Sequence, residues 1–327
     1  MTQQLRFAPD DLDALVAATA TAIGVSAEYV EKDFWATEVL RAACVERSIS
    51  VQNGELAPVT FVFKGGTSLS RVFRITQRFS EDIDLLAVFP AGAGMSARHS
   101  VLKQVDRDVT AHLGVSGEVV NGSSTTGVKR YTVYPYATQR SSGLLREGVL
   151  LELGSRGGTQ PASIRLYSSM VAEFALATYG EGAEAWEEFA PFEVLTLAPE
   201  RTLLEKLSGL HTMVVSGDQV KLSTAGRHLY DVACLLEDAS VVEALRTLGP
   251  EGVAALTADI EAHSTQAGFA SLPRPAGGFA ASPVFSPIHE MHSLVLKAYD
   301  AAMPLVHGRR PTGAQMLSIV REHAELL

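Results

Sequence analysis

The 327-residue sequence has little of what marks secreted, membrane or nucleic-acid-coating proteins. Its two cysteines, Cys44 and Cys234, are too few for a disulfide framework or a four-cysteine zinc site, which suits a reducing compartment. It has no charged-then-apolar leader and no run of about 18 apolar residues, so we expect a cytoplasmic protein without a membrane span. Basic residues are also few, 27 against 37 acidic ones, and the net charge of −10 argues against general nucleic-acid binding. Any contact with RNA must come from a local basic patch.

The most informative stretch is Phe61 to Leu85, FVFKGGTSLSRVFRITQRFSEDIDL. It begins with an apolar segment that reads as a buried strand. The Gly-Gly pair that follows permits a tight turn with exposed N–H groups, and the next residues open a helix whose N-terminus favours anions. We therefore expect a phosphate-binding turn made by Lys64, Gly65, Gly66, Thr67 and Ser68.

A second strand at the end of this stretch carries Asp82 and Asp84. The two-residue period of a strand places both carboxylates on one face and Ile83 and Leu85 on the other. Two carboxylates with no basic residue between them favour Mg²⁺ or Mn²⁺. Taken separately, a Gly-Gly pair is most often an ordinary turn and a D-x-D pair an ordinary solvated strand end.

In this order and within one short unit, the strand, glycine turn, helix and D-x-D strand resemble the signature of the nucleotidyltransferase superfamily. The fuller string, K-G-G-T-S-L-S followed by R-F-S-E-D-I-D-L, is similar to the AbiEii/AbiGii toxin family, whose MenT-type members are toxins of toxin–antitoxin systems. The resemblance implies an NTP substrate, a divalent metal held by the aspartates, and two further motifs. These motifs are P-E-R-T-L-L-E-K-L, whose Lys206 would face the nucleotide, and R-H-x-x-D, whose Asp231 would lie near the catalytic centre.

Lys206 and Asp231 each have an ordinary structural interpretation as well. Lys206 falls away from the apolar stripe of a helix predicted over residues 199–215, where a lysine is normally solvated. Asp231 lies on a mostly buried helix over residues 227–236, and Arg227 is placed to pair with it four residues earlier. The functional alternative is that Asp231 orients Lys206 or acts as a base.

Glu152 lies in a predicted strand over residues 148–154. It fits the solvent side of an edge strand, or the third acidic residue that nucleotidyltransferases bring to the metal from a later strand. The second interpretation predicts a metal set of Asp82, Asp84 and Glu152. Lys129 and Arg130, on a strand over residues 128–135, must point to opposite faces.

The string V-E-K-D-F-W, residues 30–35, lies in a helix predicted over residues 27–47. Its spacing favours a solvated charged face beside two aromatic core residues. The family resemblance gives Lys32 and Asp33 a weaker claim on the site. A proline- and glycine-rich loop over residues 272–283 is either a linker or a segment that closes over nucleotide or acceptor.

Arg71, Arg74 and Arg78 recur at i, i+3 and i+7 on a helix predicted between the glycine turn and the aspartates. They should therefore share one face, where Arg71 and Arg74 are candidates for RNA binding and Arg78 is a candidate for nucleotide binding. Alternatively, Arg78 pairs with an active-site carboxylate and another arginine contacts the triphosphate. Ser80 is a phosphorylation candidate, because a phosphate would add roughly −1.5 to −2 charges two residues from Asp82.

The predicted fold is α+β, with a nucleotidyltransferase subdomain over residues 1–165 and a helical C-terminal subdomain over residues 166–327. The first would hold helices within residues 9–47 and a small mixed sheet over about 58–165. The active cleft would lie between the two, with Lys206 and Asp231 on the helical side.

The resemblance implies a toxin that moves a nucleoside monophosphate from NTP to an RNA acceptor, with the 3′ end of tRNA favoured, and so stops translation. It also implies a cognate antitoxin, either a winged-helix protein or a kinase. Two alternatives remain open. One is a transferase that modifies a small-molecule or protein hydroxyl, and the other is a catalytically idle interaction protein.

Overall fold

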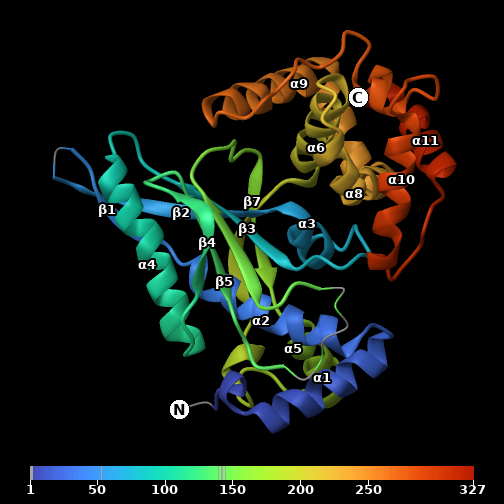
Figure 1. Ribbon diagram of the computed structural model, residues 1–327. Helices are drawn as coiled ribbons and strands as arrows, with labels where there is room; N and C mark the ends of the chain where they lie inside the picture. The colour runs from blue at the N-terminus through green and yellow to red at the C-terminus, as the bar shows by residue number, and fades with distance from the viewer. Residues whose placement is uncertain (1–2, 53, 139, 141–142, 144) are drawn as a thin grey trace. The chain divides into compact units, whose positions relative to one another are not determined.

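The computed structural model describes residues 3–52, 54–138, 140, 143 and 145–327 (Figure 1). The chain divides into two compact units. Unit 1 holds residues up to Val72, Ser80–Ser155 and Ala162–Thr196, and unit 2 holds Phe73–Phe79, Arg156–Pro161 and Leu197–Leu327. The boundary expected at residue 165 thus falls inside a strand of unit 1, and the main division lies between Thr196 and Leu197.

The described part of unit 1 contains an eight-stranded mixed sheet, in agreement with the predicted α+β class. Its strand order is β4 (Glu118–Thr125), β5 (Lys129–Tyr134), β6 (Val149–Gly154), β3 (Asp82–Val88), β2 (Leu56–Lys64), β8 (Phe192–Leu197) and β7 (Ala162–Tyr167), while β1 (Arg47–Ser50) pairs with β2 beside this path. The β3–β6 and β2–β8 pairs are parallel, and the β2–β3 and β5–β6 pairs are antiparallel. Glu152 therefore lies on an interior strand, and its interpretation as an edge residue is wrong.

Two helices, α2 (Ala27–Ala43) and α4 (Met95–Leu113), cover one face of this sheet (Figure 1). Ile83 and Leu85 of β3 point into the core beneath them, together with Leu151 and Leu153 of β6. Because side chains alternate along a strand, Asp82, Asp84 and Glu152 point to the opposite face. The alternation predicted for the D-x-D strand is confirmed.

A second core joins α2 to the first and last helices of unit 1. The helices α1 (Pro9–Ile23) and α5 (Met170–Tyr179) pack on α2 through Leu12, Val16, Phe34 and Val171. Ser26 caps α2 by accepting a hydrogen bond from Tyr29 N at 3.3 Å, which satisfies an otherwise unpaired donor of the first turn. Short helical turns η1 (Leu5–Phe7) and η3 (Glu187–Phe189) complete this layer. The first part of the predicted helical subdomain, residues 166–180, is thus part strand and part helix.

The glycine turn follows β2 directly. A single turn of α-helix, α3 (Gly65–Thr67), passes into a short π-helical turn, η2 (Ser68–Val72), and the helix ends there. Arg74 has a left-handed backbone, with φ of 56°, and Arg78 forms an isolated bridge with Val306 of unit 2. The prediction that Arg71, Arg74 and Arg78 share one helical face is wrong, because the helix ends at Val72 and neither Arg74 nor Arg78 lies on it.

Unit 2 is mainly helical in its described residues, as predicted. Its longer helices are α6 (Pro199–Val215), α7 (Gln219–Thr224), α8 (Gly226–Glu237), α9 (Ala239–Gln266), α10 (His292–Ala302) and α11 (Gly313–Glu322). The buried helix α8 packs against α6, α9, α10 and α11. Proline at the first position of α6 suits the helix start, and α9 is kinked at Gly249-Pro250. Short turns η4 (Phe279–Ala281), η5 (Pro283–Phe285), η6 (Met303–Leu305) and η7 (Ala324–Leu326) fill the connections.

The proline- and glycine-rich loop of unit 2 packs on the last residue of the sequence. Arg274 Nε and Phe279 N both donate to the main-chain oxygen of Leu327, at 2.8 and 2.9 Å. Gly278 has φ of +77°, and a Cβ on it would lie 2.8 Å from the carbonyl carbon of Leu327. These contacts give the loop a packing role within unit 2.

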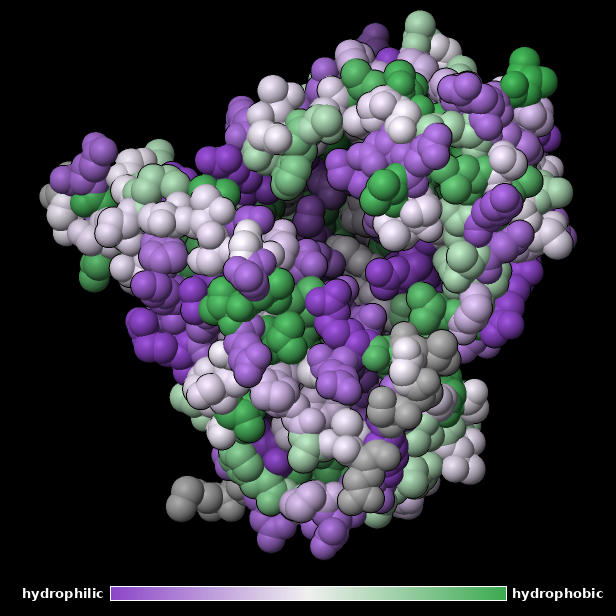
Figure 2. Space-filling view, in the orientation of Figure 1, coloured by the Kyte–Doolittle hydropathy of each residue, from purple (hydrophilic) through white to green (hydrophobic). Residues whose placement is uncertain are grey.

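Hydrophilic side chains are spread over the face seen in Figure 2, with smaller hydrophobic patches between them. Among the residues that the structure describes, no helix is both long and apolar enough to cross a membrane.

Candidate active site

Four side chains form a row across the centre of the sheet in unit 1. Lys64 of β2 is paired in register with Asp84 of β3, Asp84 with Glu152 of β6, and Glu152 with Tyr131 of β5. Residues in register point to the same face of a sheet, and Asp82 shares that face because it lies two residues before Asp84. The sheet thus brings together the three predicted carboxylates and adds Lys64 and Tyr131. We call Asp82, Asp84 and Glu152 the carboxylate row.

The carboxylate row crowds negative charge. Partial burial and the charges of Asp84 and Asp82 raise the pKa of Glu152 to about 7, against weaker opposition from Arg146 and Lys129. Burial, Glu152 and Asp84 likewise raise the pKa of Tyr131. Like charges at close range disfavour one another's ionised forms, and a cation relieves that cost. The row is therefore suited to attract a positive ion.

The chemistry of the carboxylate row fits a divalent metal in donor type. Carboxylate oxygens are the ligands that Mg²⁺ and Mn²⁺ prefer, and Mg²⁺ is commonly held by one or two carboxylates together with substrate phosphates and water. Within the described ranges, no three His, Cys, Asp or Glu side chains form a complete preformed metal site. The row thus matches a divalent metal in the chemistry of its oxygens, and metal binding there stays a prediction.

The glycine turn is built against the aspartate strand. Gly65 has φ of +78°, and a Cβ on it would lie 1.9 Å from Asp84 Oδ2. Thr67 Oγ1 donates to Asp82 O at 2.6 Å and lies 2.9 Å from Ser80 Oγ, while Ser68 Oγ donates to Gly65 O at 2.9 Å. The two buried hydroxyls therefore fasten the turn. Phosphate binding at this turn stays a prediction.

The charged residues of the V-E-K-D-F-W string are buried, so the solvated-face interpretation is wrong. Glu31, Lys32 and Asp33 are 6%, 1% and 4% exposed. Asp33 binds Arg71 Nε at 2.6 Å and accepts a hydrogen bond from Met170 N at 2.7 Å. Arg71 is thereby an internal ion-pair partner at the end of the glycine turn, which argues against its predicted contact with RNA. Lys129 and Arg130 do point to opposite faces, since Arg130 pairs with Asp106 of α4.

A second cluster, within unit 2, is centred on Asp231 of α8. This carboxylate is fully buried and binds Arg78 Nε at 2.6 Å, Arg78 Nη2 at 2.8 Å and Lys206 Nζ at 2.8 Å. Its ion pairs are thus with Arg78 and Lys206, and not with Arg227 as the helical spacing suggested. Lys206 itself is buried, which overturns its expected solvation. We call Arg78, Lys206, His228 and Asp231 the Asp231 cluster.

The charges of the Asp231 cluster hold its groups in defined protonation states. Burial opposes ionisation of Asp231, but Arg78 and Lys206 hold its pKa well below the usual range. Lys206 and burial lower the pKa of His228 to about 3, so its imidazole is neutral at pH 7. Lys206 Nζ then donates to His228 Nδ1 at 3.1 Å, which leaves the ring proton on Nε2. A carboxylate held ionised by two cations suits an orienting role for Asp231 better than that of a base.

Sequence reasoning missed His228, although it stands in the R-H-x-x-D string itself. It also missed Tyr131, whose place follows from the alternation of β5 once its register with β6 is known.

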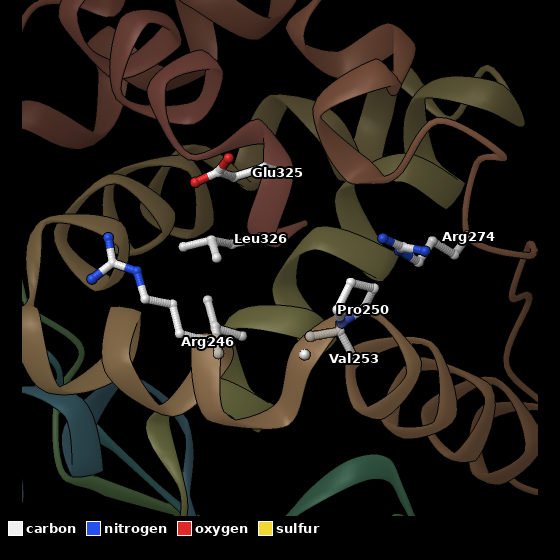
Figure 3. A pocket seen from close by; sticks show the side chains of 8 residues that line it. Arg246, Pro250, Val253, Arg274, Glu325 and Leu326 are labelled. Atoms are coloured by element: carbon white, nitrogen blue, oxygen red, sulfur yellow. The ribbon is translucent and has the colours of Figure 1, made fainter.

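Two cavities lie within unit 2. The first, about 230 Å³, is lined by Leu245, Arg246, Gly249, Pro250, Val253, Arg274, Glu325 and Leu326, of which Arg274 belongs to the proline- and glycine-rich loop over residues 272–283 (Figure 3). The second, about 220 Å³, is lined in part by Arg74, Tyr230, Cys234 and Arg309. Neither cavity is lined by a residue of the carboxylate row, by Lys206 or by Asp231.

Comparison with known proteins gives one family. The profile described as "Nucleotidyl transferase AbiEii toxin, Type IV TA system" matches residues 56–292. No curated protein matches the chain. Seven chains among solved structures match, one of which is MenT4, a nucleotidyltransferase toxin from Mycobacterium tuberculosis H37Rv. It is 16% identical, with 96% of this chain and 94% of that chain covered and a TM-score of 0.43. Because the family profile spans more than half of the chain, from the glycine turn through the Asp231 cluster, the protein belongs to the AbiEii family of nucleotidyltransferase toxins of type IV toxin–antitoxin systems.

Proposed function

We propose that this toxin is a metal-dependent enzyme that transfers a nucleoside monophosphate from NTP to the 3′ end of tRNA and thereby blocks translation. The observation that carries the proposal is the register of Asp84 with Glu152 on one face of the sheet, beside Asp82 and Lys64. Family membership supplies the reaction class. In this proposal the row would supply acidic oxygens to a metal-bound triphosphate.

In this proposal the carboxylate row holds Mg²⁺ or Mn²⁺ through Asp82 and Asp84, with Glu152 as a third ligand. The bound metal would lower the pKa of the acceptor hydroxyl and stabilise the leaving pyrophosphate. The chain's own residues orient the substrate: the main-chain N–H groups of the glycine turn would donate to the phosphates, and Lys64 adds positive charge in register with Asp84.

The transfer is an in-line displacement. The acceptor oxygen forms a bond to the α-phosphorus, the bond from that phosphorus to the α–β bridging oxygen breaks, and pyrophosphate leaves with the electron pair. The hydroxyl proton passes to solvent. Enzymes that act in this way depend on positioning and on electrostatic stabilisation more than on covalent chemistry.

The Asp231 cluster enters the proposal through Lys206. We propose that the ammonium of Lys206 neutralises negative charge on the triphosphate. Asp231 and His228 would hold the Lys206 side chain in its orientation. Arg78 then keeps Asp231 ionised rather than contacting substrate itself. Family membership also implies a partner antitoxin, and we propose that Ser80 is a point of control, because it lies 2.9 Å from Thr67 at the turn and two residues before Asp82.

The test is incubation of the purified protein with total RNA, Mg²⁺ and each α-³²P-labelled NTP in turn. We expect label in RNA of tRNA size with at least one NTP, and none with Asp84→Ala or Asp82→Ala. Asp108→Asn is the matched control and should retain full activity. Asp108 pairs with Arg47 and lies on α4, which covers the face of the sheet opposite the carboxylate row. No labelled product with any NTP, or undiminished label with Asp84→Ala, would reject the proposal. Label in protein or in a small molecule would reassign the acceptor.

A further inference from the structure

We propose that Lys32 is a positioning residue for the carboxylate row, because one buried ammonium binds the segments that lead into both β3 and β6. The inference rests on the proposed function, since it concerns the geometry of the same carboxylates. Lys32 lies on α2, which covers the opposite face of the sheet, and its own contacts are with main chain and with Glu81.

The ammonium of Lys32 is buried, with two main-chain hydrogen bonds and one ion pair. The residue is 1% exposed, and its Nζ donates to Arg146 O at 2.5 Å and to Gly148 O, and lies 3.5 Å from Glu81 Oε2. An ammonium has three hydrogens to donate, and here three acceptors surround it. Burial lowers the pKa of Lys32, while Glu81 and Asp82 raise it in opposition.

The acceptors of Lys32 lie directly before the first residues of β3 and β6 or close to them. Glu81 immediately precedes Asp82, the first residue of β3, and Gly148 immediately precedes Val149, the first residue of β6. Glu81 Oε2 also accepts a hydrogen bond from Arg146 N at 2.6 Å, which closes a ring of Lys32, Glu81 and the Arg146 backbone. We call this ring with Gly148 the Lys32 clamp. It ties the starts of the two parallel strands together.

The carboxylate row begins at the clamp. Asp84 is the third residue of β3 and Glu152 the fourth of β6, so each lies within about 10 Å of its strand start at 3.3 Å per residue. A slip of one residue between strands turns every side chain to the other face. The clamp therefore fixes which residues of β3 and β6 are opposite one another, and with it the pairing of Asp84 with Glu152.

A packing role alone does not account for a lysine here. An ammonium is costly to bury, and an apolar side chain of similar size would fill the same volume at lower cost. Instead, the ammonium of Lys32 has two main-chain acceptors and the Glu81 carboxylate around it, at the starts of both strands of the row. Adjacent Asp33 binds Arg71 at the end of the glycine turn, so neighbouring residues of α2 reach both parts of the predicted site.

The test replaces Lys32 with methionine, which keeps the length of the side chain and removes the three donors. We expect Mn²⁺, followed by electron paramagnetic resonance without nucleotide, to bind about 10-fold more weakly, as for other residues that support metal ligands. We expect kcat for labelled NMP transfer to fall about 100-fold while KM for the NTP changes by less than about threefold, because misplaced reacting groups affect the chemical step most.

The matched control is Glu38→Gln. Glu38 is equally buried on the same helix and pairs with Arg41 and His112, away from the clamp. It should lose stability as Lys32→Met does but keep Mn²⁺ affinity and kcat within about twofold. Should folded Lys32→Met match Glu38→Gln in both measurements, Lys32 is only structural and the inference is overturned.

Glu81→Gln decides the question if Lys32→Met does not fold. The Glu81 side chain is 16% exposed, and its amide replacement can still accept from Arg146 N while losing the ion pair with Lys32. We expect a three- to tenfold loss of Mn²⁺ affinity, at the low end for supporting residues, and unchanged affinity would overturn the inference. Failure of the proposed function appears differently, as NMP transfer that persists in Asp84→Ala.

Discussion

The carboxylate of Asp84 occupies the space that a side chain on residue 65 would need, since a Cβ on Gly65 would lie 1.9 Å from Asp84 Oδ2. The backbone of Gly65 also has φ of +78°, which residues with a side chain rarely adopt. The glycine is thus required twice, once by its conformation and once by the aspartate beside it.

Gly65→Ala should lose NMP transfer by about 100-fold, because the new methyl group displaces Asp84 from its place in the row. Gly92→Ala separates this effect from backbone strain. Gly92 has φ of +79°, and a Cβ on it would meet nothing within 4 Å, so both changes should cost about 1–2 kcal/mol of stability but only Gly65→Ala should lose activity. Equal activity in the two variants would show that the close approach to Asp84 has no consequence for the reaction.

Glu152 predicts a pH dependence of stability. Its carboxyl pKa is raised from 4.5 to about 7 in the folded protein, so between these values the folded state binds a proton that the unfolded state has lost. The free energy of unfolding from Glu152 therefore falls as the pH rises from about 4.5 to about 7. Urea unfolding in EDTA should show this decline in the wild type and a smaller one in Glu152→Gln. If the wild type and Glu152→Gln have the same dependence of unfolding free energy on pH, the neighbouring carboxylates do not raise the pKa of Glu152.

Glu152→Gln should also reduce NMP transfer, but less than Asp82→Ala or Asp84→Ala does, because it keeps a carbonyl oxygen in the row. Full activity of this variant would remove Glu152 from the metal set.

Asp231→Asn should destabilise the protein by about 3–5 kcal/mol, since it leaves Arg78 and Lys206 as neighbouring cations without their buried partner. Glu237→Gln, on the same helix, removes a more exposed ion pair with Arg309 and should cost no more than about 1 kcal/mol. Urea denaturation compares the two. A loss for Asp231→Asn as small as that for Glu237→Gln would contradict the central place of Asp231 in its cluster.

Ser80→Asp should weaken NMP transfer, because it adds a negative charge beside the glycine turn and Asp82, where a triphosphate must bind. Ser80→Ala should stay active, and Ser100→Asp on the exposed side of α4 is the control for added charge. The readout is KM for the labelled NTP. A Ser80→Asp enzyme with the wild-type KM would count against Ser80 as a control point.

Arg74 is the arginine with which to test RNA binding, because it is exposed whereas Arg71 and Arg78 are buried in ion pairs. Arg74→Gln should weaken tRNA binding and reduce the slope of log affinity against log salt by about one unit, with KM for the NTP unchanged. Arg246→Gln, exposed on α9, is the control for loss of charge. A rise in KM for the NTP with tRNA binding unchanged would assign Arg74 to the nucleotide.

Local patterns in the sequence predicted the parts of the fold that local forces determine. The alternation of Asp82 to Leu85 and the Pro199 helix start were sufficient for β3 and α6, because one-sided burial and helix-end chemistry leave few alternatives. The family resemblance, rather than spacing, directed attention to Lys206 and Asp231. Their ordinary interpretations as a solvated lysine and an Arg227 partner did not hold.

Long-range pairing could not be predicted in the same way. The partners of Asp231 and Lys32 are Arg78 and Glu81, 153 and 49 residues away in the sequence, and no helical or strand period reports such a distance. The sequence interpretation assumed that charged residues on a helix are solvated, whereas Glu31, Lys32 and Asp33 are buried because each finds a partner on another element. The segment after Val72 was read as helix for a related reason, since its departure into unit 2 depends on contacts with distant residues.

The alternation of the two units along the chain limits how this protein can be divided. Three segments of unit 1 alternate with three of unit 2, so the polypeptide passes from one to the other five times. A fragment that starts at Leu197 would lack Arg78, and its Asp231 would keep Lys206 alone as an ion-pair partner. The helical unit therefore cannot be transplanted as one continuous piece, and exchanges between relatives must carry residues 73–79 along with it.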